Sequence, residues 1–153
     1  MATPIEALHG VVNATQALPG LVTAGQPTRE HFRALQDAGV RVVLDIRHPM
    51  EPRGYDQQAL MEELGFEYMN IVVSDGTLTD ETLGRILEVL RDNKDRSVLF
   101  HCNSGNRVGG AMIPYLILDH GMSEEDATTA AMRMGLRGTA LLEWGLEYAR
   151  ARA

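Results

Sequence analysis

The chain has 153 residues, a formal net charge of −7 at neutral pH and a single cysteine. This length suffices for a hydrophobic core, so we predict one domain over residues 1–153. One cysteine excludes an internal disulfide framework, and the negative charge argues against broad binding to nucleic acid or anionic membranes. The first twenty residues have neither a basic start nor a continuous apolar stretch. We therefore expect no secretion signal and no membrane span, and a cytoplasmic location.

The N-terminal third of the chain is predicted to contain one or two short edge strands, a helix and a buried strand. Residues 11–26 alternate short apolar runs with Asn, Pro and Gly, a pattern typical of edge strands and a turn. Thr28 is placed to cap a helix with Phe32 and Leu35 on its buried face. The valine-rich run over residues 40–46 predicts a parallel strand that is covered on both faces.

The middle of the chain repeats the alternation of helix and strand. A polar loop over residues 47–55 leads to a short helix capped by Asp56, and residues 66–73 form the next predicted strand. Thr79 then caps a longer helix with an apolar stripe on one face. That stripe consists of Leu83, Ile86, Leu87 and Leu90.

The C-terminal half is predicted to be helical. A strongly apolar helix follows residue 110, with Pro114 inside it as an expected kink. Ser123 and Thr139 are each placed to cap a further helix. The expected fold class is therefore α/β, with three layers, a mostly parallel sheet of four or five strands, and a helical C-terminal half.

The segment SVLFHCNSGNRVGG, residues 97–110, carries the strongest chemical signal. A short apolar run ends at Cys102, and small polar residues lead to Arg107 before the long helix. Backbone N–H groups of such a loop, together with a helix N-terminus, form a cradle for an oxyanion and favour a thiolate. The guanidinium of Arg107 suits bidentate contact with phosphate or sulfate oxygens. We predict a reactive thiol at Cys102 rather than a structural one.

Other polar residues are expected near this loop, because ligands of open parallel sheets bind beyond the carboxyl ends of the strands. Arg47 with His48, and Ser74 with Asp75, follow two of the predicted strands, so these ends should converge on the Cys102 loop. The five histidines show no ligand spacing, and we expect neither a metal nor another cofactor.

Three arginines are weaker candidates for contact with an anionic substrate. Arg47 and Arg53 lie near a strand end and Arg137 lies in the tail, although each position is more often occupied by a solvated surface arginine. His101, next to the cysteine, is expected to order the loop by hydrogen bonding rather than to exchange protons.

From about Gly25 the chain resembles the protein tyrosine phosphatase superfamily, especially its compact bacterial members that are like dual-specificity phosphatases. The resemblance rests on AGQPT, VRVVLDIR, GFEYMNIVVSDG, HCNSGNR and the tail DHGMSEEDATTAAMRMGLRG. It implies a phosphatase fold and a two-step reaction, in which Cys102 attacks phosphorus and forms a cysteinyl-phosphate. Arg107 and the loop N–H groups would bind the equatorial oxygens.

The resemblance also implies a carboxylic acid that protonates the leaving oxygen and later activates water. Asp75 is the first candidate for this role and Asp80 the second. The substrate would be a phosphorylated protein or a small-molecule phosphoester. The implied phosphate-binding residues are Asn103, Ser104, Gly105, Asn106, Arg107 and Val108.

Two features depart from the familiar phosphatase motif. Four residues instead of five separate Cys102 from Arg107, and Val108 stands where a Ser or Thr hydroxyl commonly helps the thiolate to leave. The second departure predicts slow turnover of the covalent intermediate unless Ser104 or a water substitutes.

The short loop also leaves two other functions open. Rhodanese-like sulfurtransferases, which use a Cys persulfide, share the four-residue gap, and VVLDIRHPMEPRG resembles one of their segments. A non-catalytic anion-binding module is the other alternative. The capped helix expected after Gly121 favours the phosphatase, because a rhodanese would return to a strand there.

Overall fold

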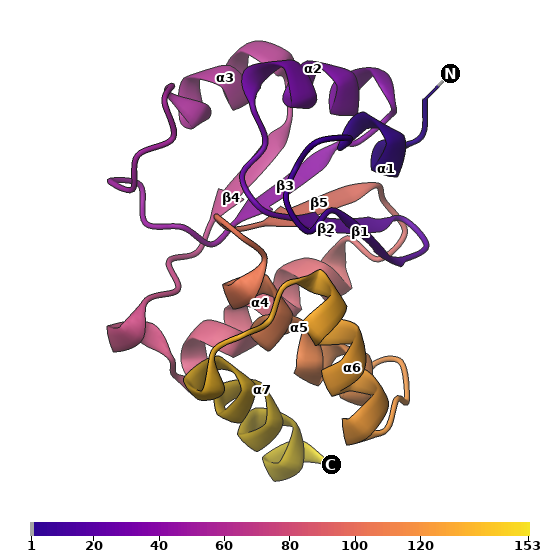
Figure 1. The fold of residues 1–153 in the computed structure, drawn as a ribbon, viewed down its shortest axis with the longest axis vertical. Coiled ribbons are helices and arrows are strands. Elements are labelled where there is room, and N and C mark those ends of the chain that lie inside the picture. Colours follow the sequence, from indigo (N-terminus) through magenta and orange to yellow (C-terminus); the bar gives the residue numbers. More distant parts are fainter. Residues whose placement is uncertain (1) are drawn as a thin grey trace.

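The computed structural model describes residues 2–153, which form a five-stranded sheet with helices on both faces (Figure 1). The strands are β1 (Thr15–Leu18), β2 (Leu21–Ala24), β3 (Val42–Asp45), β4 (Glu67–Asn70) and β5 (Val98–His101). Their spatial order is β1-β2-β5-β3-β4. β1 pairs with β2 in antiparallel fashion and the other neighbours are parallel, which confirms the predicted α/β fold class.

Two helical layers enclose the sheet (Figure 1). One layer contains α1 (Pro4–Ala7), α2 (Arg29–Asp37) and α3 (Gln57–Leu64). The other contains α4 (Asp80–Asp92), α5 (Asn106–Leu118), α6 (Glu124–Met134) and α7 (Thr139–Arg152), with the short 3-10 helix η1 (Asp75–Thr77) ahead of α4. None of the helices within residues 2–153 has the length and apolarity needed to cross a bilayer.

Four helices begin at the capping residues predicted from the sequence. The side chains of Thr28, Asp56, Thr79 and Ser123 each accept a hydrogen bond from the backbone N–H three residues further on. These bonds satisfy donors that the first turn of a helix leaves unpaired. The starts of α2, α3, α4 and α6 are therefore encoded locally.

Two predicted elements differ from the structure. Thr139 is the first residue of α7 rather than its cap, because Gly138 takes the N-cap position and makes no side-chain bond there. Of the one or two edge strands expected in residues 11–26, only β1 lies at an edge. β2 lies between β1 and β5, and all four of its residues are buried.

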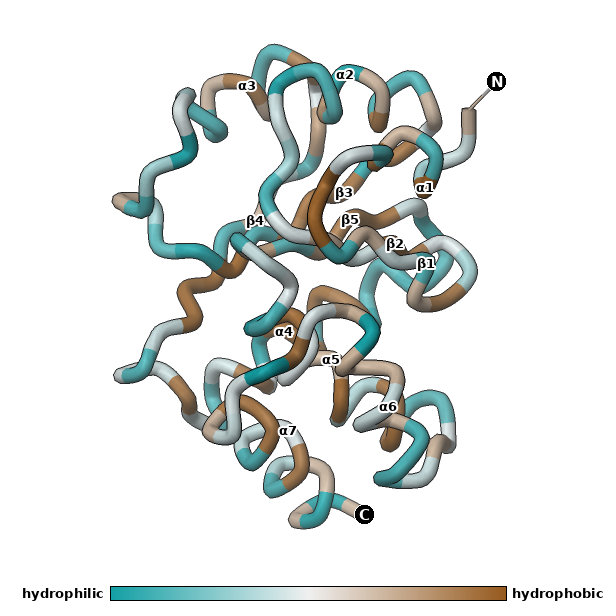
Figure 2. Tube along the Cα trace, viewed as in Figure 1, coloured by the Kyte–Doolittle hydropathy of each residue, from teal (hydrophilic) through white to brown (hydrophobic). Residues whose placement is uncertain are grey.

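Strand residues alternate between the two helical layers, as the pleat of a sheet requires. In β3, Val42 and Leu44 pack among residues of α4–α7, whereas Val43 packs among residues of α1–α3. Figure 2 shows the hydrophobic segments gathered in the central strands and the helices next to them. Asp45 of β3 and His101 of β5 are register partners at the carboxyl ends of these strands. The sheet therefore places a buried carboxylate beside a buried imidazole next to the predicted site.

Candidate active site

The loop after β5 encloses the cysteine and leads directly into α5. Cys102 is fully buried, and its Sγ accepts a hydrogen bond from the N–H of Gly105 at 3.1 Å. Gly105 has φ +92°, and a Cβ at this position would overlap the carbonyl oxygen of Met134. Only glycine therefore fits where the loop turns into the helix. The predicted arrangement of strand, loop and helix is present.

Two carbonyl groups of this loop are bound from behind. The N–H of Gln26 donates to the carbonyl oxygen of Asn103 at 2.9 Å, and Nδ2 of Asn13 donates to that of Ser104 at 2.7 Å. The carbonyl and the N–H of one trans peptide point in opposite directions. These bonds therefore favour N–H groups that face the cysteine side of the loop, as an anion cradle needs.

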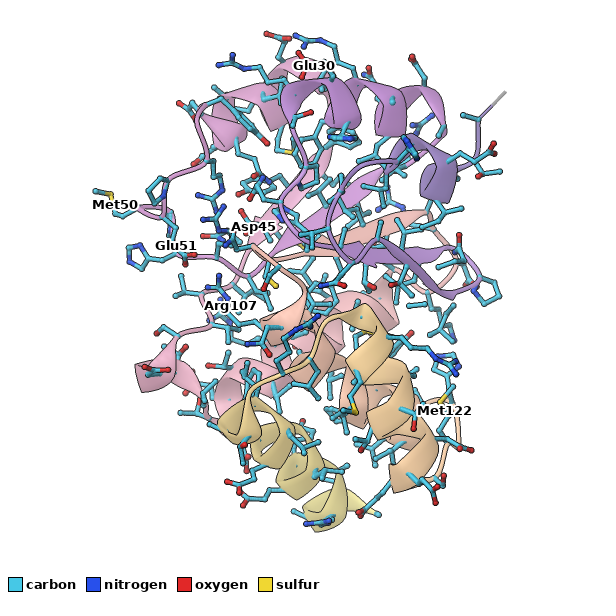
Figure 3. All side chains as sticks on the ribbon, viewed as in Figure 1. Glu30, Asp45, Met50, Glu51, Arg107 and Met122 are labelled. Atoms are coloured by element: carbon cyan, nitrogen blue, oxygen red, sulfur yellow. The ribbon has the colours of Figure 1, made fainter. Side chains whose placement is uncertain are left out.

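Arg107 lies in the first turn of α5 and reaches toward the loop that follows β3 (Figure 3). Its Nη1 and Nη2 donate to the two carboxylate oxygens of Glu51, both at 2.9 Å, and Nη1 also donates to the carbonyl of Val73 at 3.2 Å. The hydrogen bonds with Glu51 raise the pKa of Arg107, so this side chain is a permanent cation. The guanidinium group of Arg107 is therefore directed into the site and not into solvent.

Glu51 is the partner that the sequence analysis missed. Its Oε1 also accepts a hydrogen bond from Nε of Arg47 at 3.1 Å, and its Oε2 accepts one from the N–H of His48 at 2.7 Å. The bond with Arg107 lowers the pKa of Glu51 to about 2, so the carboxylate is ionised at neutral pH. The four-residue spacing from Arg47 was the available signal in the sequence. A carboxylate in this position offers the guanidinium the same pair of oxygens as a phosphate.

A buried polar cluster holds the loop that carries Glu51. The carboxylate of Asp45 accepts hydrogen bonds from Arg53 and from the hydroxyl of Tyr68, both at 2.6 Å. Arg47 donates to the side-chain oxygen of Gln26 at 2.9 Å and to a backbone carbonyl of the same loop. The side chains of both arginines are at most 6% exposed. They support the loop, so the expectation of solvated surface arginines at these two positions was wrong.

His101 has the ordering role expected of it. It is fully buried, its Nδ1 lies 3.1 Å from the carbonyl oxygen of Cys102, and its Nε2 lies 2.9 Å from Nε2 of Gln57. Burial lowers the pKa of His101, which keeps the imidazole neutral at neutral pH. A neutral ring with both nitrogens engaged fixes the end of β5 just before the cysteine.

A cavity of about 490 Å³ opens beside Arg107. Asp75 lines it, while Asp80 does not and instead lies 3.6 Å from Arg152 at the other end of α7. The two carboxylates proposed as general acid are thus separated by the fold, and only Asp75 adjoins the site. The remaining lining residues are Glu51, Val73, Ser74, Leu78, Asn106, Gly138, Ala140 and Leu141.

The polar ends of the three strands meet as expected, because the loops after β3 and β4 contribute Glu51 and residues 73–75 to the wall beside Arg107. The side chain of Val108 is fully buried in the core of α4–α7, and Ser104 is exposed. Arg137 donates to the carbonyl of Gly135 and does not line this cavity. No group of three or more His, Cys, Asp or Glu in residues 2–153 is placed to hold a metal ion.

Comparison with protein families matches residues 11–143 to the family described as DSP-PTPase phosphatase fused to NAD+ kinase. No curated protein sequence matched. A putative phosphatase from Shewanella putrefaciens CN-32 has a similar structure, with a TM-score of 0.81 and 22% identity over 96% of this chain and 97% of that chain.

Two further solved structures are similar in fold. Tk-PTP in its active form has a TM-score of 0.74 and 20% identity, over 90% of this chain and 97% of that chain. The core catalytic domain of a PP-IP phosphatase from S. cerevisiae, in complex with citrate, has a TM-score of 0.75 and 16% identity, over 92% and 91% of the two chains.

Proposed function

Because the chain belongs to the family of DSP-PTPase phosphatases and is a cysteine-dependent phosphatase of phosphomonoesters, we propose that Cys102 is its nucleophile, Arg107 its phosphate-binding cation and Asp75 its general acid. The observation that carries the proposal is the position of Sγ of Cys102. It lies beneath the N–H of Gly105, next to the start of the helix that carries Arg107. The sulfurtransferase finds no support, since the capped helix α6 follows Gly121 where a rhodanese would have a strand.

In the first step, the thiolate of Cys102 attacks phosphorus and the bond from phosphorus to the leaving oxygen breaks. The guanidinium of Arg107, released from Glu51, binds two equatorial oxygens, and N–H groups of residues 103–108 bind the phosphoryl group. Asp75 gives its proton to the leaving oxygen. The products are a cysteinyl-phosphate and a free alcohol or phenol.

In the second step, the carboxylate of Asp75 takes a proton from water, which attacks the phosphorus of the cysteinyl-phosphate. The bond between sulfur and phosphorus breaks, and inorganic phosphate leaves. In many members of the superfamily a hydroxyl after the arginine assists the departing thiolate, whereas Val108 has none. We therefore propose that breakdown of the intermediate limits the rate.

The lining of the cavity suggests how many phosphates a substrate carries. Its charged residues are one arginine, Arg107, and two carboxylates, Glu51 and Asp75. A second phosphate would meet no cation in this lining and would be repelled by the acids. We propose that the substrate is a protein or a small molecule that carries one phosphate. We also propose that residues 1–153 form a single phosphatase-like domain and that the protein acts in the cytoplasm.

Hydrolysis of p-nitrophenyl phosphate tests the assignment of Cys102 and Arg107. The wild-type protein should release nitrophenol, the Cys102→Ser variant should not, and brief quenching with acid should trap one phosphate on the wild-type chain. Arg107→Lys should lose at least about 100-fold in kcat/KM, because two parallel hydrogen bonds disappear.

A matched control for Arg107 is Arg33→Lys, since Arg33 also pairs with a glutamate, Glu63 at 3.3 Å, but lies on the surface. This control should keep wild-type kinetics. Full activity of Cys102→Ser would refute the nucleophile. Transfer of sulfur from thiosulfate to cyanide, without hydrolysis of the phosphoester, would replace the phosphatase with the sulfurtransferase.

A further inference from the structure

The peptide group between Ser104 and Gly105 is hydrogen-bonded through both its carbonyl and its N–H. The carbonyl of Ser104 accepts a hydrogen bond from Nδ2 of Asn13 at 2.7 Å, and the N–H of the same peptide, on Gly105, donates to Sγ of Cys102 at 3.1 Å. We propose that Asn13 is a positioning residue, which keeps this N–H directed at the sulfur and so favours the thiolate of Cys102. The inference rests on the proposed function in taking Cys102 as the nucleophile.

The orientation of this peptide decides which charge the sulfur faces. If the peptide rotated by half a turn, the carbonyl oxygen of Ser104 would point at the sulfur and oppose its ionisation. Glycine accepts such rotations at little cost, and Gly105 already has φ +92°. Asn13 supplies a contact from outside the loop that favours the observed orientation.

The neighbouring peptide of the loop is held by a backbone donor instead of a side chain. The carbonyl of Asn103 is held by a backbone donor, the N–H of Gln26, at 2.9 Å. The carbonyl of Ser104 is held by the side-chain amide of Asn13, which lies 91 residues earlier in the chain. A substitution can therefore remove the second contact while leaving the first one intact.

Asn13 is itself fitted to this task. It has φ +55°, a left-handed conformation that asparagine adopts more readily than most residues. The hydroxyl of Thr15 donates to its carbonyl at 2.9 Å. A Cβ on Gly135 would lie 2.7 Å from Nδ2 of Asn13, so a glycine there leaves the space that the amide occupies. The turn, the hydroxyl and the glycine together direct the amide toward the Ser104 carbonyl.

The same hydrogen bond could have a purely structural role, in which Asn13 acts as a clamp that joins the N-terminal turn to the loop. The two roles differ in what they predict for the sulfur. Loss of a clamp lowers stability alone, whereas loss of a positioning residue also shifts the pH at which the thiol ionises. The test must therefore read the ionisation of Cys102 directly, apart from stability and from phosphatase activity.

Ultraviolet absorbance of the thiolate, measured against pH on the full chain, gives that reading because Cys102 is the single cysteine. Cys102→Ser provides the blank. Asn13→Gly keeps the left-handed backbone but removes the donor, and we expect its ionisation midpoint to rise by about 0.5–1 pH unit. With p-nitrophenyl phosphate at a fixed pH below the midpoint, kcat/KM should fall by about 3-fold to 10-fold.

The matched control is Asn93→Ala. Nδ2 of Asn93 also donates to a backbone carbonyl, that of Val89, at 2.8 Å, but at the end of α4. This variant should lose stability and keep the wild-type midpoint. Where Asn13→Gly does not fold, Asn13→Asp retains the shape without the donor. It is titrated in high salt to screen its charge, and the same rise is expected.

The proposal is overturned if the folded Asn13 variant ionises with the wild-type midpoint, whatever its stability. The readout separates this failure from failure of the proposed function. A midpoint that shifts in a protein that hydrolyses no phosphoester supports the role of Asn13 and removes the phosphatase. If the wild-type protein hydrolyses p-nitrophenyl phosphate and the midpoint of Asn13→Gly is unshifted, the phosphatase is supported and the role of Asn13 is refuted.

Discussion

Both carboxylate oxygens of Glu51 accept hydrogen bonds from the guanidinium of Arg107, each at 2.9 Å. This is the bidentate geometry in which an arginine binds a phosphate. In the function we propose, Glu51 therefore occupies the position of a substrate on the one cation that lines the cavity, and the phosphoryl group would have to displace it.

Removing the charge of Glu51 should strengthen anion binding. In Glu51→Gln the neutral amide competes less well for Arg107. We expect inorganic phosphate to inhibit about 3-fold to 10-fold more strongly, since charged hydrogen bonds exceed neutral ones by about 1 kcal/mol. Because the pKa of Glu51 is about 2, the wild-type pair persists throughout the usual assay range, and the difference should not depend on pH between about 5 and 8.

Inhibition constants for phosphate check this prediction. Glu63→Gln is the matched control, because Glu63 also pairs with an arginine but on the surface. Weaker phosphate binding by Glu51→Gln would show that Glu51 orients Arg107 for the substrate instead of competing with it.

Asp75→Asn should slow the first chemical step most for substrates whose leaving oxygen is strongly basic. Phenyl phosphate should lose about 100-fold in kcat/KM and p-nitrophenyl phosphate much less, because a general acid contributes most when the leaving oxygen is basic. Steady-state kinetics with both substrates make the comparison. Asp80→Asn is the control, and a larger loss in that variant would transfer the acid role to Asp80.

Val108→Thr should speed the breakdown of the cysteinyl-phosphate. In the resembling phosphatases a Ser or Thr hydroxyl at this position commonly helps the thiolate to leave, so we expect kcat to rise by about 3-fold to 10-fold, at a stability cost of about 1–2 kcal/mol for a buried hydroxyl. Rapid-quench kinetics should show a burst of nitrophenol in the wild type and a smaller burst in the variant.

The control for Val108 is Val98→Thr, another buried valine of the same core. It should show the stability cost without the gain in kcat. A wild-type protein without a burst would mean that breakdown of the intermediate is not the slow step.

His101 should make the protein less stable in mild acid. Burial is the main cause that lowers the pKa of His101 from 6.5. The charge of Asp45 raises this pKa, whereas the charges of Arg53 and Arg47 lower it further. The unfolded chain then binds a proton first as pH falls. The contribution of His101 is complete above about pH 6.5, and below it up to about 1.4 kcal/mol is lost per pH unit until the folded pKa is reached.

Urea unfolding at pH 7 and pH 5 measures this loss. His101→Gln should be less stable at pH 7 and should lose less on acidification. His120→Gln, which removes a histidine from an exposed position on Tyr115, should keep the wild-type slope. Equal slopes for His101→Gln and the wild type would contradict the prediction.

Local patterns in the sequence were enough to predict much of the fold. The caps Thr28, Asp56, Thr79 and Ser123 act within three residues of themselves, and the valine-rich run of β3 identifies a strand covered on both faces. The spacing of Cys102 and Arg107 likewise lies within one loop, so that part of the candidate site could be proposed from the sequence.

The rest of the site depends on contacts between distant segments. Asn13 binds a carbonyl 91 residues away, and Glu51 binds Arg107 across 56 residues. Asn13 has no periodicity that marks it, and the four-residue spacing of Glu51 from Arg47 does not indicate a contact with Arg107. Arg47 and Arg53 were misjudged for the same reason, since a buried ionic partner such as Asp45 becomes visible only after the strands pair.

Complete burial also shields the sulfur of Cys102 from oxidants. The chain has no second cysteine to capture a sulfenic acid as an internal disulfide. Peroxide should therefore inactivate the protein slowly, and the protein would owe its chemical lifetime to burial of this sulfur and not to repair.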